Sequence, residues 1–109
     1  MNKVEELIPK AEDRLFCVKI GKVQRKNLYE MSRKYWKAKL DKASLATHVL
    51  AIERGIVVAV YIPQEWMHSK EREGRIEFIG KEEPNSAYIG KCVDSYYGRS
   101  ANPVKYINF

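Results

Sequence analysis

The longest apolar stretch, residues 47–66 (THVLAIERGIVVAVYIPQEW), limits the fold more than any other part of the chain. Val, Ile and Tyr dominate it, and these residues suit a pleated, half-buried surface. Its one turn signal ends at Gly55, which predicts a β-hairpin with strands over 47–53 and 56–62 and a positive φ at this glycine. Because 56–62 is apolar at every position, we expect a central strand that is covered on both faces.

Short strand-like runs and one helical pattern account for the rest of the chain. Apolar runs between turn signals predict strands over 14–20, 75–79, 87–93 and 103–109. Leu28, Met31 and Tyr35 recur at helical spacing and predict one helix, whose C-terminal end carries the basic residues up to Lys39. The connecting segments that we expect are a linker over 41–46, a helical turn over 64–68 and a loop over 96–100.

These elements predict an α+β fold. The 109 residues fit one domain that spans positions 1–109. We expect a mostly antiparallel, curved sheet, closed into a partial barrel or left open, with one principal helix packed on it. The two isolated cysteines, Cys17 and Cys92, and the absence of a signal-peptide pattern predict a cytoplasmic protein with reduced thiols. No uninterrupted apolar run is long enough for a membrane span, so no membrane partner is expected.

Positive charge is concentrated in one quarter of the chain. The net charge is +6, and residues 19–42 alone hold nine basic residues against two acidic ones. This asymmetry indicates a polyanionic partner, which we expect to be RNA or DNA. The alternative interpretation is a solvated helix face that keeps the protein in solution.

Familiar catalytic patterns are missing from the sequence. It contains no HExxH, no paired cysteines, no GxSxG and no phosphate-binding loop, so neither a metal nor a cofactor is predicted and a non-enzymatic protein is favoured. An enzyme would require a set of dispersed polar residues to meet in one cleft: Glu53, Glu65, Glu77 and His68.

Basic and aromatic residues together suggest how a nucleic acid would be bound. Lysines and arginines neutralise phosphates, and exposed aromatic rings stack on bases. Trp36 lies off the apolar stripe of the helix, so we expect it at the surface or in a pocket, where it would stack on a base. The predicted phosphate contacts are Lys22, Arg25, Lys26, Arg33, Lys34 and Lys37. A second set of residues is predicted to line a pocket: Trp66, Tyr97 and Arg99.

The first half of the chain resembles a known family. The runs RLFCVKI, YWKAKL and THVLAIERGIVVAVY, within residues 14–66, are similar to the opening of PUA-like folds of the EVE and YTH kind. Of the site residues, only Trp36 matches a family position, the tryptophan after the first helix. The resemblance implies a small pseudo-barrel that recognises nucleic acid, often a modified base in an aromatic pocket.

The function that we expect is therefore a non-enzymatic nucleic-acid-binding module with a basic face and an aromatic pocket. The alternative is a small protein-interaction or inhibitor domain, of the phage or mobile-element type, which would dock an acidic protein partner through the same basic face.

Overall fold

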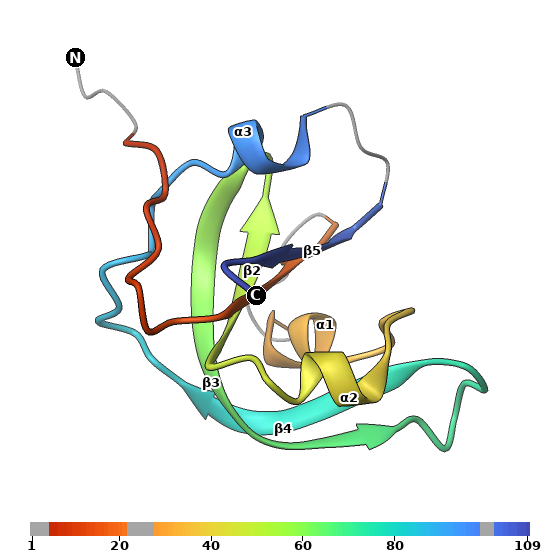
Figure 1. Ribbon diagram of the computed structural model, residues 1–109. Helices are drawn as coiled ribbons and strands as arrows, with labels where there is room; N and C mark the ends of the chain where they lie inside the picture. Colours follow the sequence, from red (N-terminus) through yellow and green to blue (C-terminus); the bar gives the residue numbers. More distant parts are fainter. Residues whose placement is uncertain (1–4, 22–27, 99–101) are drawn as a thin grey trace.

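The computed structural model describes residues 5–21, 28–98 and 102–109, and these form a small α+β fold (Figure 1). Five strands make one mixed sheet in the order β4-β3-β2-β1-β5. The β1–β2 pairing is parallel and the other three pairings are antiparallel. The strands are β1 (Leu15–Lys19), β2 (His48–Glu53), β3 (Ile56–His68), β4 (Ile76–Glu82) and β5 (Val104–Ile107), and the helices are α1 (Leu28–Arg33), α2 (Leu40–Ala43) and α3 (Asp94–Tyr97).

The predicted central hairpin is confirmed as β2 and β3. Its turn has positive φ at both central residues, 52° at Arg54 and 80° at Gly55, as a two-residue hairpin turn of type I′ requires. A Cβ atom at Gly55 would lie 2.2 Å from the Oδ1 atom of Asp94, so any other residue here would have to displace this side chain as well as adopt a positive φ. As expected, β3 lies inside the sheet, between β2 and β4.

The second half of β3 bends away from β2 and pairs with β4 (Figure 1). The register shifts at 63–65, and Gly80 fits opposite because a Cβ atom there would lie 2.3 Å from the carbonyl oxygen of Ile62. Trp66 pairs with Phe78 in this half. The prediction of a helical turn over 64–68 is therefore wrong, because pairing with β4 holds this segment extended.

The sheet separates two hydrophobic cores. The first core lies inside the curve of the sheet and includes Phe16 and Tyr61, with α1 and α2 packed against it. The second core lies on the opposite face and includes Leu7 and Val60, with α3 and the N-terminal segment over it. Residues of β3 contribute to both cores, which confirms that the strand predicted over 56–62 is covered on both sides, and residues of β1 do the same.

The predicted helix is present as α1, but it is much shorter than the sequence pattern indicates. α1 ends at Arg33, and the longest of the described helices has only six residues. The reason is tertiary: the backbone N–H and C=O groups of Trp36 pair with Ile76 at the start of β4, at 3.0 and 2.9 Å. A backbone that pairs with a strand cannot continue a helical ladder.

Other boundaries also differ from the sequence prediction. Residues 87–93 form turns rather than a strand, and only Cys92 makes isolated bridges there. The predicted linker over 41–46 contains most of α2, and the predicted loop over 96–100 begins inside α3. The last strand is confirmed as β5. The described strands leave β4 and β5 as two separate edges, so the sheet is open.

Candidate functional site

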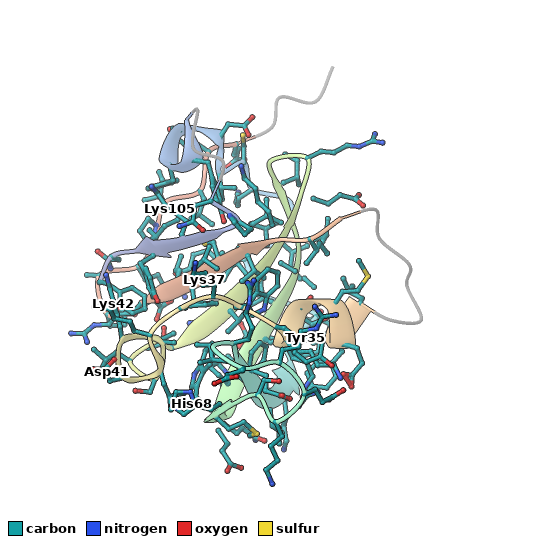
Figure 2. The ribbon with its side chains drawn as sticks, turned by 90° about the vertical axis from the view of Figure 1, so that its right-hand side faces the viewer. Tyr35, Lys37, Asp41, Lys42, His68 and Lys105 are labelled. Carbon is teal, nitrogen blue, oxygen red and sulfur yellow. The ribbon has the colours of Figure 1, made fainter. Side chains whose placement is uncertain are left out.

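Residues 35–44 cross the opening between the β4 edge and the β5 edge of the sheet, and we call them the crossing segment. Trp36 fastens this segment to β4 through its backbone pairing with Ile76. At the β5 end, the Nζ atom of Lys42 lies 4.2 Å from the ring centre of Tyr106, whose hydroxyl also forms a hydrogen bond with the backbone of Lys39. Tyr35, Lys37, Asp41 and Lys42 of the crossing segment are labelled in Figure 2. Two pockets flank the segment.

The first pocket, here the Trp66 pocket, has a volume of about 650 Å³. Trp66 supplies an aromatic wall, since its ring packs on Phe16 at 5.0 Å and on Phe78 at 5.1 Å. Its indole N–H is buried and has no hydrogen-bond partner among the described residues. The other lining residues combine apolar and polar groups: Ala38, Lys39, Leu40, Asp41, Ser44 and His68.

The second pocket, here the Lys37 pocket, has a volume of about 480 Å³ and is more enclosed. Its lining brings together three chain regions: Tyr35, Trp36 and Lys37 of the crossing segment, Arg75 before β4, and Asn102, Pro103 and Val104 at the start of β5. Lys37 and Arg75 are exposed, and neither forms an ion pair within residues 5–21, 28–98 and 102–109. No carboxylate is among the lining residues.

Trp36 does not present an accessible ring. Its side chain is only 9% exposed, and its indole N–H donates a hydrogen bond of 2.8 Å to the carbonyl oxygen of Ser32. Of the two positions expected for Trp36, the surface position with an accessible ring is therefore wrong, whereas the pocket position agrees with the structure. Its ring forms part of the first core and one wall of the Lys37 pocket.

Arg33 and Lys34, two of the predicted phosphate contacts, are held by carboxylates. Arg33 donates from one terminal nitrogen to Glu77 at 2.8 Å, from the other to Glu30 at 3.1 Å, and from Nε to the carbonyl oxygen of Phe78 at 2.9 Å. Burial by itself would lower the pKa of Arg33, but the hydrogen bond to Glu30 and the two carboxylate charges raise it overall. Lys34 lies 3.6 Å from Glu30 and 3.8 Å from a second carboxylate, so both cations have internal partners.

The predicted pocket of Trp66, Tyr97 and Arg99 is not brought together in the described structure. Trp66 packs against the first core, whereas Tyr97 is buried in the second core on the other face of the sheet. The Tyr97 hydroxyl donates to the carbonyl oxygen of Pro103, and burial raises its pKa. Four predicted site residues lie outside the described residues: Lys22, Arg25, Lys26 and Arg99.

Two pocket-lining cations, Lys39 and Arg75, and Lys42 of the crossing segment were absent from the predicted site. Lys39 and Lys42 belong to the same basic run as Lys37, so the charge pattern alone could have identified them. No such signal identifies Arg75, because it lies 38 positions after Lys37 in the sequence. The Trp36–Ile76 pairing brings it to the pocket.

The described residues also bear on other classes of site. No three His, Cys, Asp or Glu side chains gather there as a metal site would require, and Glu77 is held by Arg33. Cys17 is buried and free, and burial raises the pKa of its thiol to about 12, as expected for a thiol that packs as a small hydrophobic group. Among the described helices, none has the length and apolarity to cross a bilayer.

The chain was also compared with known proteins. No family model, no curated protein and no solved structure matches it.

Proposed function

We propose that this protein is a non-enzymatic nucleic-acid-binding module that holds a single strand across the crossing segment. The observation that carries the proposal is a group of four exposed cations. Lys37, Lys39 and Arg75 line the two pockets, and Lys42 belongs to the crossing segment, with its Nζ atom over the ring of Tyr106. None of them forms an ion pair with a described carboxylate, and Asp41 is the one acidic residue that lines either pocket.

The distribution of charge supports a polyanionic ligand with aromatic groups. Free cations beside a pocket can neutralise phosphates, whereas Arg33 and Lys34 are already neutralised inside the protein. The wall formed by Trp66 provides an aromatic surface next to these cations, and stacking of a base on such a surface contributes roughly 1–3 kcal/mol. The proposed site therefore retains Lys37 and Trp66 from the sequence prediction, and it assigns the stacking on a base to Trp66 instead of Trp36.

The resemblance to PUA-like readers belongs to the same proposal. It is supported by the strongly bent β3 and by the way in which the crossing segment bridges the two sheet edges, as a pseudo-barrel would require (Figure 1). An experimental structure with RNA or DNA bound would test this point, because a strand bound over α3 and the second core instead would contradict it. We also propose a cytoplasmic location, which cell fractionation would test.

The test is binding of fluorescent single-stranded oligonucleotides, followed by anisotropy over a salt series. Four phosphate contacts predict that log K falls with log[salt] with a slope of about −3, since each contact contributes about −0.7. The triple variant Lys37→Gln, Lys39→Gln and Lys42→Gln should weaken binding at least tenfold and bring the slope close to −1. Its free energy of unfolding should change by less than about 0.5 kcal/mol at Lys37 and at Lys39, which are exposed. At Lys42 the change should be about 0.5–1 kcal/mol, because the contact with the Tyr106 ring is also lost.

Lys81→Gln is the matched control. Lys81 is an exposed lysine at the other end of β4, away from both pockets, so its loss should leave affinity nearly unchanged. No binding at low salt, or binding without salt dependence, would contradict the proposal. Polyglutamate that binds as tightly as the oligonucleotide would point instead to an acidic protein partner.

A further inference from the structure

We infer that the Lys37 pocket receives a terminal phosphate, the monoester at one end of a nucleic-acid strand. This inference rests on the proposed function and assigns different chemistry to the two pockets. The Trp66 pocket has an aromatic wall and a carboxylate, whereas the Lys37 pocket has two cations and no carboxylate in its lining.

The charge of the Lys37 pocket matches a monoester better than an internal phosphodiester. A phosphate monoester carries close to two negative charges at neutral pH, and a diester carries one. Lys37 and Arg75 provide two positive charges, and the Arg72 guanidinium lies 5.0 Å from the ring centre of Tyr35, so a third cation stands beside the pocket. Arginine can hold a phosphate through two parallel hydrogen bonds, and a monoester, with three terminal oxygens, still keeps one oxygen for Lys37.

The shape of the pocket also favours an end group. Trp36 and Val104 are buried residues of the first core, and they close one side of the pocket. A chain cannot pass through a pocket that is closed on this side, so an end group enters it with less bending of the strand than an internal phosphate does. The Trp36–Ile76 backbone bonds of 3.0 and 2.9 Å fix this wall relative to Arg75, which means that the pocket is preorganised.

The experiment compares oligonucleotides of one sequence with a 5′-phosphate, a 3′-phosphate or no terminal phosphate. We expect one phosphorylated end to bind at least tenfold more tightly than the unphosphorylated strand. Lys37→Gln and Arg75→Gln should each reduce this preference to less than threefold, and Arg75→Gln should change binding of the unphosphorylated strand much less. Lys105→Gln is the control. Val104 and Tyr106 of β5 both face the first core, and because side chains alternate along a strand, Lys105 between them lies on the opposite face.

Equal affinity for all three strands would overturn the inference, as would a preference that survives both pocket substitutions. A protein that binds none of the strands would overturn the proposed function as well. In that case, titration with inorganic phosphate, followed by NMR at the Arg75 Nε–H and the Trp36 indole, separates the two proposals. Saturable shifts that Lys37→Gln abolishes would support an anion-binding Lys37 pocket in a protein that does not bind nucleic acid. Unchanged spectra would contradict both proposals.

Discussion

The two faces of the sheet are covered by chain segments of opposite character. Residues 28–46, which we call the first cover, lie over the first core and hold five basic residues against two acidic ones. Residues 5–13, which we call the second cover, lie over the second core and hold four acidic residues against one basic. The second cover is fastened by polar bonds: the Asn108 side chain donates to the carbonyl oxygens of Lys10, Ala11 and Asp13, and the Tyr88 hydroxyl donates to Asp13 at 2.6 Å.

The first cover combines fixed and free charges. Its early part is held by Arg33, and its later part, the crossing segment, keeps exposed lysines without ion pairs to described carboxylates. This difference teaches that positive charge in the sequence has two uses here. Arg33, which is bonded to β4, stabilises the fold, whereas the exposed lysines of the crossing segment remain available for a ligand.

Loss of Arg33 should have the largest effect on stability. Arg33→Met removes the partner of Glu77, which is only 8% exposed, and leaves the carbonyl oxygen of Phe78 without its donor. Breaking a buried ion pair in this way costs roughly 3–5 kcal/mol of unfolding free energy. Urea denaturation measures it, and the double variant Arg33→Met and Glu77→Leu should recover part of the loss. A loss below 1 kcal/mol in the single variant would show that the first cover does not depend on this pair.

Leu7→Ala should weaken the second cover to a slightly smaller extent. Leu7 is fully buried, and its backbone N–H donates to the carbonyl oxygen of Cys92 at 2.8 Å. Truncation of a buried leucine destabilises by about 2–5 kcal/mol, and the end-of-chain position favours the lower half of that range. The same denaturation experiment measures it, with Ile8→Ala as the control because Ile8 is 79% exposed. Equal effects at the two positions would mean that the N-terminal segment does not pack as described.

Tyr88→Phe should have the smallest effect, and that effect should depend on pH. Removing the hydroxyl leaves the Asp13 carboxylate without its donor, at a cost of roughly 1–3 kcal/mol. Burial, the hydrogen bond to Asp13 and the nearby negative charges raise the pKa of Tyr88 from 10 to about 12. The folded state therefore keeps this proton longer than the unfolded state, and the associated stability is complete below pH 10 and is lost as the pH rises to 12.

The measurement is the difference in unfolding free energy between the wild type and Tyr88→Phe from pH 8 to pH 12. The difference should be constant up to pH 10 and then shrink. A difference that stays constant up to pH 12 would show that the Tyr88–Asp13 bond does not shift the titration of Tyr88.

Local sequence patterns predicted the strands better than the helices. The hairpin was predictable because the apolar run and Gly55 specify strands and turn within twenty residues. The length of α1 was not predictable, since the spacing of Leu28, Met31 and Tyr35 favours a helix and only the distant Ile76 competes for the backbone of Trp36. The same long-range pairing places Trp36 in a pocket wall rather than at the surface.

The candidate site shows the same division. The basic run that contains Lys37 could be recognised from composition, but composition does not say which cations carboxylates hold. That depends on Glu77 in β4, which lies 44 positions from Arg33. Arg75 could not be assigned to the site at all, because no local pattern relates it to the crossing segment.

The sequence by itself determined the strand-rich α+β class, the central hairpin and the location of the excess positive charge, because each depends on residues close together in the chain. The tertiary structure alone decided where α1 ends, which face of the sheet each aromatic ring occupies and which cations remain unpaired. These properties depend on partners that are distant in sequence, and burial against such partners outweighs the local preferences of a short segment.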